Sequence, residues 1–270
     1  MCYGRSILLT GGTSGIGLAV AQRAVLEGAS HVIIVTRTAS NGSNAVQKVT
    51  EATGLPDAPV SYMSNDFMKF PPEMVKSVLN PLYINTLINC AGLTSNQLII
   101  KQRNEGAEAV WDANYHLPFK LSKMLLNDYM ARARLIQKDK SDSRASEPSW
   151  CIVNVSSLLA QKGGKGSATY AASKAALIAL TRVLTLESGD LSERAQDVMP
   201  PIRANAILPG YIDTPMIEGF SEARKAQLTA QIPSRRFGKP AEVADAIMFL
   251  LRNEYANNCI LNLDGGLSAI

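Results

Sequence analysis

The chain has 270 residues, of which 46% are hydrophobic and 19% are charged, a balance typical of a globular protein with a sizeable core. The formal net charge of +4 is spread along the chain rather than gathered in a basic cluster, so a nucleic-acid surface is not indicated. No apolar run reaches the roughly 18 residues that a transmembrane helix needs, and the two histidines and four cysteines show no metal-ligand spacing.

A glycine-rich turn stands between the first predicted strand, residues 6–10, and a helix pattern that ends near Gly28. Glycines allow a tight turn and let the backbone approach a pyrophosphate, while free N–H groups of the helix N-terminus face the anion. The spacing is G-x-x-x-G-x-G rather than the more usual G-x-G-x-x-G. The order of strand, turn and helix still predicts a dinucleotide site, with contacts expected from Gly11, Thr13, Ser14, Gly15, Ile16 and Gly17.

The second predicted strand, residues 31–37, ends in Thr36 and Arg37, at the place where dinucleotide-binding folds contact the ribose. A carboxylate there would favour the 2′-hydroxyl of NAD, whereas an arginine pairs with the 2′-phosphate of NADP. Because no acid stands at this place, we predict NADP(H) as the cofactor and Arg37 as its phosphate contact. The alternative is that Arg37 points into solvent.

Two further strand ends supply candidate cofactor contacts. The third strand, residues 60–64, runs into Asp66 and Phe67, and a short helix is expected at 71–80. Asp66 could accept a hydrogen bond from an adenine amino group, or it could be a plain turn residue. The fourth strand leads into a turn of small residues that suits close approach of a ribose and base, so we also expect cofactor contacts from Asn89, Ala91 and Gly92.

A long helical stretch, residues 104–134, contains Asn114, His116 and Pro118. An asparagine and a proline inside a helix predict a local kink, and a kink could free a carbonyl for a bound water. His116 has no nearby nucleophile pattern, so we interpret it as structural. The segment 137–149 is polar and is expected to be an exposed loop or a helix extension, and the segment 189–201 is expected to be irregular.

The pattern with most chemical content follows the apolar strand 151–155. Ser157 lies at the carboxyl end of that strand, where open α/β sheets bind their ligands. Tyr170 and Lys174 stand four apart in a helix pattern, so they share a face. A cation beside a phenol lowers the pKa of the phenol and makes it a usable general acid/base near neutral pH. The alternative is an ordinary tyrosine and a solvated lysine on a half-buried helix.

The remaining elements complete an alternation of strands and helices. The strand 203–208 ends at Pro209 and Gly210, after which Ile212 and Thr214 could reach the nicotinamide, and an amphipathic stretch, 216–232, is placed like a substrate lid. A helix, 241–251, and a strand, 259–263, end the chain. The alternation predicts one domain over 1–270, a Rossmann-like, doubly wound parallel sheet of about seven strands with helices on both faces.

Taken together, these motifs resemble the classical short-chain dehydrogenases/reductases over essentially the full chain. The resemblance implies a catalytic tetrad of Asn114, Ser157, Tyr170 and Lys174. In that family the tyrosine donates the proton, the serine holds the substrate carbonyl, the lysine lowers the tyrosine pKa and binds the nicotinamide ribose, and the asparagine anchors a proton-relay water. It also implies a homotetramer that uses the helices beginning near Asn104 and Tyr170.

Within the family, the segment from Ile232 to Val243 and the ending Asp264-Gly265-Gly266 are most similar to 3-oxoacyl-(acyl-carrier-protein) reductases of fatty acid synthesis. Residues 89–94 resemble the fungal mitochondrial version, which implies the mitochondrial matrix. No presequence is visible, because the first strand begins by residue 6, so the cytoplasm is the alternative. Candidate contacts for an acidic carrier are Arg132, Arg134, Arg235 and Arg236.

Two departures keep other functions open. A basic residue often found in the glycine turn of NADP-preferring members is Ser14 here, and the segments 137–149 and 189–201 are longer than in bacterial relatives. The alternative functions are reduction or oxidation of another carbonyl substrate, such as a polyketide, steroid or sugar, and a low-activity cofactor-binding subunit of a hetero-oligomer.

Overall fold

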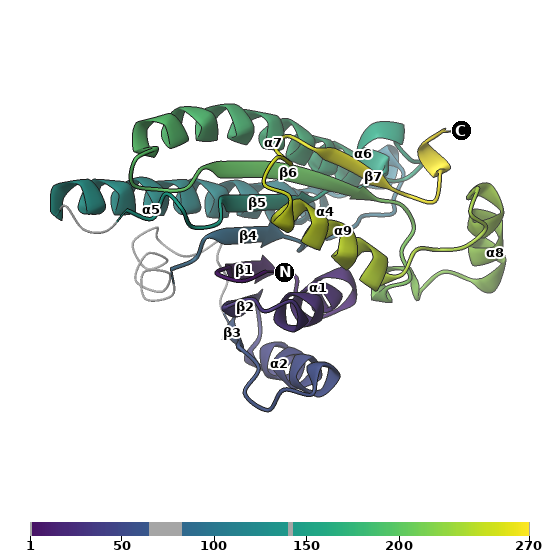
Figure 1. The fold of residues 1–270 in the computed structure, drawn as a ribbon. Coiled ribbons are helices and arrows are strands. Elements are labelled where there is room, and N and C mark those ends of the chain that lie inside the picture. Colours follow the sequence, from purple (N-terminus) through teal and green to yellow (C-terminus); the bar gives the residue numbers. More distant parts are fainter. Residues whose placement is uncertain (1, 65–82, 140–142, 270) are drawn as a thin grey trace.

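A parallel β-sheet forms the centre of the molecule. The computed structural model describes residues 2–64, 83–139 and 143–269, and within them seven parallel strands pair in the order β3-β2-β1-β4-β5-β6-β7 (Figure 1). This order and the helices on both faces confirm the predicted doubly wound fold. The strand bounds are β1 Ser6–Thr10, β2 His31–Thr36, β3 Val60–Ser64, β4 Thr86–Asn89, β5 Trp150–Val155, β6 Ile202–Pro209 and β7 Ile260–Leu263.

The central strands are buried along their whole length, as expected of a parallel sheet covered on both faces. Every residue of β1, β4, β5 and β6 is buried, whereas the edge strands β3 and β7 are only partly covered. This gradient follows from position in the sheet, because β3 and β7 each have a neighbouring strand on one side only.

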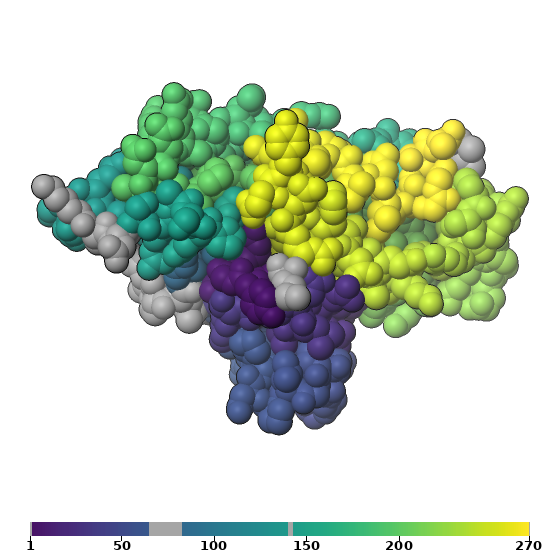
Figure 2. Space-filling model, viewed as in Figure 1, coloured from purple at the N-terminus to yellow at the C-terminus, as the bar shows by residue number. Residues whose placement is uncertain are grey.

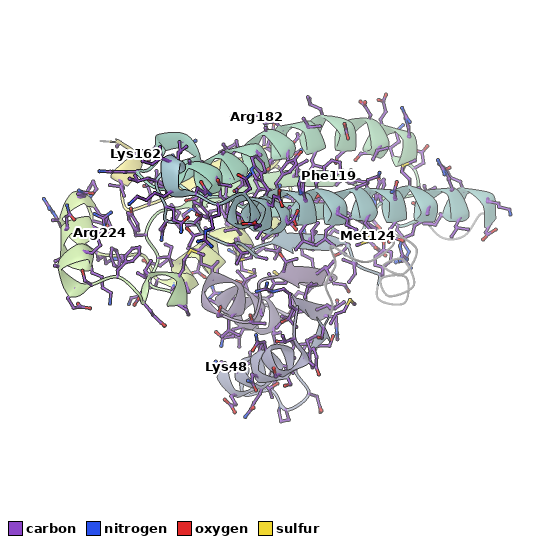
Figure 3. The ribbon with its side chains drawn as sticks, turned by 180° about the vertical axis from the view of Figure 1, so that it is seen from behind. Lys48, Phe119, Met124, Lys162, Arg182 and Arg224 are labelled. Carbon is purple, nitrogen blue, oxygen red and sulfur yellow. The ribbon has the colours of Figure 1, made fainter. Side chains whose placement is uncertain are left out.

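Helices α1 (Gly15–Leu26), α2 (Ala39–Thr53) and α9 (Pro240–Arg252) cover one face and share a core with the side chains of β1 and β2 that point toward them. On the other face, α5 (Leu117–Asp139) and α7 (Ala168–Ala195) lie side by side over a second core (Figures 1 and 3). The smaller helices α4 (Asn104–Trp111), α6 (Leu159–Lys162) and α8 (Glu222–Gln231) lie toward the carboxyl ends of the strands.

The long helical stretch is interrupted as predicted. Between α4 and α5, the residues Asp112–His116 form a π-helical turn that contains Asn114. Such turns are rare and concentrate at functional sites. The predicted lid contains a 3₁₀ turn, Pro215–Ile217, followed by α8. The predicted helix 71–80 lies outside the described residues.

The prediction of an irregular segment over 189–201 is wrong in part. Helix α7 continues to Ala195, beyond the predicted end near 188, because Ser188 and Ala195 are buried against the sheet and the Ser192 hydroxyl accepts the N–H of Ile202. Helix α5 reaches Asp139, in agreement with the helix extension that is one of the two expectations for 137–149. Polar residues at exposed positions of a helix hide the few buried positions that hold it in place.

A pair of buried arginines closes the end of the sheet opposite the strand ends that carry Ser157. Arg5 and Arg203 are each 2% exposed and donate to carbonyls at the end of α9, with Leu251 O shared between them at 2.6 Å and 2.9 Å. Cationic groups at a helix C-terminus complement its dipole. The contact joins the N-terminus to α9, and Figure 2 shows these two parts of the chain side by side. Within the described residues, no helix is both long and apolar enough to cross a membrane.

Candidate active site

One large cavity, of about 1690 Å³, opens at the carboxyl ends of β1, β4, β5 and β6. A site for a single small ligand usually measures about 300–1,000 Å³, so this cavity has room for a cofactor and a substrate together. Its walls run from the glycine turn, past Ser157 and Tyr170, to the first turn of α8. A parallel sheet with this strand order places its ligand site at this edge.

The glycine turn is packed so closely that side chains would not fit. Gly11 has φ +71°, and a Cβ there would lie 2.7 Å from the Ala91 nitrogen, while a Cβ at Gly17 would lie 2.2 Å from the Gly11 oxygen. The Thr10 hydroxyl accepts the N–H groups of Cys90 and Ala91, both at 3.1 Å, which fixes the turn to the end of β4. Helix α1 then starts with no side-chain cap and no acid in its first turn, so its N–H groups suit a phosphate.

Arg37 lies where the sequence predicts an adenosine phosphate. It lines the cavity together with Thr38 and Asn41, which come from the start of α2. Helix α2 also begins without a side-chain cap and without an acid in its first turn. Sequence reasoning missed Thr38 and Asn41, although a polar residue before a helix pattern is a usual signal for a helix start.

Among the described residues, the structure brings every predicted cofactor contact except Asn89 to the cavity wall. Asn89 does not line the cavity, because its side chain is 1% exposed and donates to Asn154 Oδ1 at 2.8 Å across the sheet. Asp66 and Phe67 lie outside the described residues. The predicted contacts that line the cavity are Gly11, Thr13, Ser14, Gly15, Ile16, Gly17, Arg37, Ala91, Gly92, Tyr170, Lys174, Pro209, Gly210, Ile212 and Thr214.

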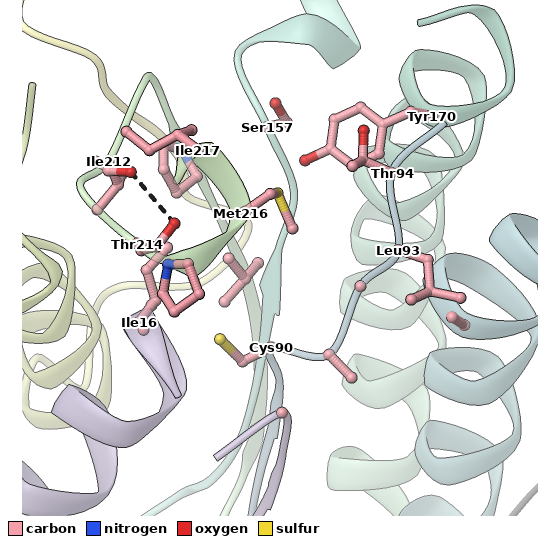
Figure 4. A pocket seen from close by; sticks show the side chains of 18 of the residues that line it. Ile16, Cys90, Leu93, Thr94, Ser157, Tyr170, Ile212, Thr214, Met216 and Ile217 are labelled. Carbon is pink, nitrogen blue, oxygen red and sulfur yellow. Dashed lines mark hydrogen bonds between the residues drawn. The ribbon is translucent and has the colours of Figure 1, made fainter. Parts of the chain in front are cut away.

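Ser157 and Tyr170 face one another inside the cavity, and Thr94 lies beside the phenol (Figure 4). Burial raises the pKa of Tyr170, and the hydrogen bond with Ser157 opposes that rise. The prediction that a neighbouring cation lowers this pKa is therefore wrong for the protein alone. The physical reason is that the removal of the phenol from water disfavours phenolate, while the Lys174 ammonium lies 6.0 Å from the ring centroid.

Lys174 is held as a buried cation. It is 3% exposed, and its Nζ donates to the Val155 carbonyl at 2.8 Å, while the Ser156 hydroxyl donates to the Lys174 carbonyl at 2.7 Å. Burial lowers the pKa of Lys174 to about 8. Val155, at the end of β5, and Ser156, which follows it, thus fix the lysine at both its side chain and its backbone.

Asn114 lies behind the cavity wall rather than in it. Its side chain is fully buried, donates to the Leu93 carbonyl at 3.0 Å and accepts the Leu93 N–H at 2.8 Å. These bonds join the π-helical turn to the loop after β4, which does line the cavity. His116 bonds Asp112 at 2.8 Å and does not line the cavity, as its structural interpretation predicts.

The substrate side of the cavity has apolar walls and a charged mouth. Apolar side chains surround the space beyond Ser157 and Tyr170: Leu93, Leu117, Leu158, Leu159, Met216, Ile217 and Phe220. Lys165, from the loop before α7, and Arg224, from the first turn of α8, supply cationic groups to the lining. Among the described residues, no three His, Cys, Asp or Glu side chains are grouped so as to hold a metal ion.

Comparison with known proteins agrees with this geometry. A family model described as "Enoyl-(Acyl carrier protein) reductase" matches residues 11–268. The 3-oxoacyl-(acyl-carrier-protein) reductase of Thermotoga maritima is 34% identical over 271 residues, covering 98% of each chain. A solved structure of a proposed beta-ketoacyl-ACP reductase matches at 28% identity and TM-score 0.78 over 100% of both chains. A proposed NAD(P)-dependent gluconate 5-dehydrogenase from Beutenbergia cavernae, with bound NADP, matches at 25% identity and TM-score 0.82, covering 99% of this chain and 98% of that one.

The chain belongs to the short-chain dehydrogenase/reductase family and is an NAD(P)-dependent oxidoreductase. Its reductase relatives include bacterial enzymes at about 30% identity, so the narrower resemblance to a fungal mitochondrial enzyme, with a mitochondrial location, finds no support. The close packing at Gly11 and Gly17 fits the glycine turn of a dinucleotide site, because the lack of side chains there allows the tight turn that brings the start of α1 to the cavity.

The buried Lys174 cation should make stability depend on pH in a predictable direction. Its pKa is about 8 when folded and 10.5 in the reference state. Below pH 8 the burial of the charge costs up to about 3 kcal/mol, and the cost fades between pH 8 and 10.5, where the unfolded chain binds the additional proton. Urea unfolding should therefore show wild type gaining stability relative to Lys174→Met across that window.

The measurement is how the difference in free energy of unfolding between wild type and Lys174→Met changes with pH. Loss of the bond to Val155 shifts this difference by the same amount at every pH, so it does not affect the trend. Lys48→Met, at an exposed position on α2, is the matched control and should show no such trend. A Lys174→Met difference that stays constant from pH 7 to 10.5 would contradict a buried charge.

Proposed function

We propose that this protein reduces a ketone to a secondary alcohol with NADPH, and that its substrate is a 3-oxoacyl thioester carried by acyl carrier protein. The observation that supports this most is the convergence of the Ser157 hydroxyl, the Tyr170 phenol and the Lys174 ammonium on one cavity that also contains the dinucleotide cradle. We assign the predicted tetrad, Asn114 included, to this reaction.

In this proposal NADPH, when bound, supplies the hydride. The Ser157 hydroxyl and the Tyr170 phenol donate hydrogen bonds to the ketone oxygen. These hydrogen bonds strengthen as negative charge develops on that oxygen, and this strengthening lowers the barrier to reduction. Tyr170 then gives its proton to that oxygen. Its raised pKa keeps the phenol protonated at neutral pH, as a proton donor must be. Lys174 is positioned by Val155 to stabilise the phenolate that remains.

Tyr170→Phe tests the proposal directly. Removal of a general acid should lower kcat by about 10²–10⁴-fold, because the ring still fills its place but has no proton to give. The measurement is NADPH oxidation with acetoacetyl thioester, alongside NADPH binding followed by nucleotide fluorescence. Binding should stay within about threefold of wild type, and normal turnover in this variant would refute the assignment.

We further propose NADPH rather than NADH as the physiological cofactor. Arg37, Thr38 and Asn41 line the adenosine end of the cavity, and the uncapped start of α2 adds free N–H groups there. Both features favour an anion, and neither Thr36 nor Arg37 offers the carboxylate that selects a free ribose hydroxyl. A related dehydrogenase carries bound NADP in the same fold.

Arg37→Leu should separate the two cofactors. Loss of a charge-assisted hydrogen bond of about 1.5–3 kcal/mol raises KM for NADPH by about 10- to 100-fold, whereas KM for NADH, which lacks the 2′-phosphate, should change little. Steady-state kinetics with each cofactor on the same protein preparation is the measurement. An equal rise in KM for NADPH and for NADH would show that Arg37 does not bind the 2′-phosphate.

The cavity lining also bears on the substrate class. Arg132 is paired with Asp128 at 2.7 Å and stacked on Tyr83, and Arg236 forms a double hydrogen bond with Glu242. These two of the predicted carrier contacts are therefore already engaged. Lys165 and Arg224 remain at the cavity mouth, beyond apolar walls that suit an acyl chain. We propose that they attract an anionic group distant from the ketone, such as the phosphate of a pantetheine arm.

Loss of the positive charges at the cavity mouth should change KM for an anionic substrate rather than kcat. The double variant Lys165→Gln, Arg224→Gln should raise KM for acetoacetyl-coenzyme A by about tenfold, because the thioester loses two cationic partners. KM for the neutral acetoacetyl-N-acetylcysteamine should stay unchanged. Lys48→Gln removes the same kind of charge from α2, away from α8 (Figure 3), and is the control.

An alternative substrate has specific support. The related gluconate dehydrogenase acts, by its name, on a sugar acid, which also combines a carbonyl or alcohol with an anion. If the wild-type protein reduces a keto-hexonate faster than either thioester, the substrate is a sugar acid and the fatty-acid proposal fails. A protein that binds NADPH but turns over neither class fits the low-activity subunit instead.

We also propose self-association through α5 and α7, in keeping with the expected homotetramer. These neighbouring helices expose Phe119, Leu135, Val183 and Leu186 by 46%, 58%, 47% and 73%. Association would remove these exposed apolar side chains from water, which favours an interface on these two helices.

A further inference from the structure

Ser173 lies between Tyr170 and Lys174 in sequence but has no part in the cavity wall. Its side chain is completely buried, in the turn of α7 that faces the π-helical segment. Its hydroxyl makes two hydrogen bonds, one with the Tyr170 carbonyl at 2.9 Å and one with Asn114 Nδ2 at 3.0 Å. A buried hydroxyl that bonds two residues of the predicted tetrad is a candidate for a role in the reaction proposed above.

The direction of every hydrogen bond in this network is fixed by chemistry. The Leu93 N–H can only donate, so it requires Asn114 Oδ1 on its side, and the Leu93 carbonyl can only accept from Asn114 Nδ2. The second amide hydrogen of Asn114 then points at Ser173 Oγ. Because that oxygen is an acceptor there, its own proton goes to the Tyr170 carbonyl. The network runs from Leu93 through Asn114 and Ser173 to Tyr170 without an ambiguous member.

The network joins three separate parts of the site. Leu93 belongs to the loop that lines the cavity, and Tyr170 to the first turn of α7 (Figure 4). Asn114 belongs to the π-helical turn. It also lies close behind the lysine: a Cβ at Gly92 would be 3.2 Å from Asn114 Oδ1 and 3.1 Å from Lys174 Nζ. A displacement of Ser173 would therefore reach the Tyr170 backbone directly, through the hydrogen bond to its carbonyl.

The first turn of α7 needs such support. It follows a loop with two left-handed glycines, Gly163 at φ +71° and Gly166 at φ +80°. Its N-cap residue, Ser167, makes no side-chain capping bond, and no acid stands in the first turn. The usual local devices that fix a helix start are thus missing from the turn that carries the Tyr170 phenol.

We infer that Ser173 is a positioning residue for the proposed reduction. Its hydroxyl ties the Tyr170 backbone to Asn114, and through Asn114 to the Leu93 wall, so that the phenol stays opposite Ser157. This inference rests on the proposed function. It concerns the placement of the Tyr170 phenol, and it is independent of the identity of the substrate and of the binding of the cofactor.

The test uses three serine variants and one matched control in the intact protein. Ser173→Ala removes both hydrogen bonds, whereas Ser173→Thr keeps a hydroxyl that can still bond the carbonyl one turn back. Ser188→Ala is the control: Ser188 lies on the same helix, is equally buried, and its hydroxyl has no hydrogen-bond partner among the described residues. Ser173→Cys fills the same volume with a weak donor and serves if the alanine variant does not fold.

We expect kcat to fall by about 10- to 100-fold in Ser173→Ala, since small misplacements of a catalytic group have effects of this size. KM for NADPH should not change, Ser173→Thr should retain most of the activity, Ser173→Cys should be intermediate, and Ser188→Ala should match wild type. The alkaline limb of the kcat profile should also move to higher pH in Ser173→Ala, because a phenol drawn away from Ser157 loses the bond that lowers its pKa.

Other results would overturn the inference. A Ser173→Ala or Ser173→Cys enzyme with wild-type kcat and pH profile would show that the hydroxyl is dispensable, and an equal loss in Ser188→Ala would reduce the effect to helix packing. Failure of the proposed function is distinguishable from either result, because the wild-type protein itself would then not reduce the thioester.

Discussion

The short bond from the Lys174 ammonium to the Val155 carbonyl is the contact on which the site depends. It connects the end of the central strand β5 to the second turn of α7, in a place where water is excluded. A buried cation is tolerated only when it is hydrogen-bonded, and here the bond also fixes its position. Ser157 follows two residues after Val155, and Tyr170 precedes Lys174 by about one helical turn, so one contact sets the relation between strand end and helix.

The parallel sheet supplies the rest of the geometry. Because all strands run the same way, the glycine turn after β1, the loop after β4, Ser157 after β5 and Pro209 at the end of β6 meet at a single edge. The close fit of Gly11 against Ala91 joins the first two of these turns. At the opposite edge, Arg5 and Arg203 hold α9 in place through the Leu251 carbonyl.

Much of this arrangement could be predicted from the sequence. The strand-like apolar runs were enough to predict the fold. Together with the helix spacing of Tyr170 and Lys174, they also predicted that Ser157, Tyr170 and Lys174, three residues of the tetrad, lie at the cavity. The roles of Asn89 and Ser173 were not accessible, because an asparagine or serine beside a motif can face either the cavity or the core, and only the packing decides. The raised pKa of Tyr170 was missed for a similar reason: the sequence shows the neighbouring cation but not the depth of burial. The full length of α7 was hidden by its exposed polar residues.

The polar residues behind the cavity divide into two kinds, and the difference has a physical meaning. Ser122 and Ser188 are buried with no hydrogen-bond partner for their hydroxyls among the described residues, so they act as small spacers between helix and sheet. Asn114 and Ser173 are buried to the same degree, yet each polar atom has a partner, and the partners belong to different elements. A fully satisfied network of this kind gives one well-defined arrangement where apolar packing would allow several. Its position directly behind Tyr170 and Lys174, and not elsewhere along α7, is what connects it with the chemistry of the site.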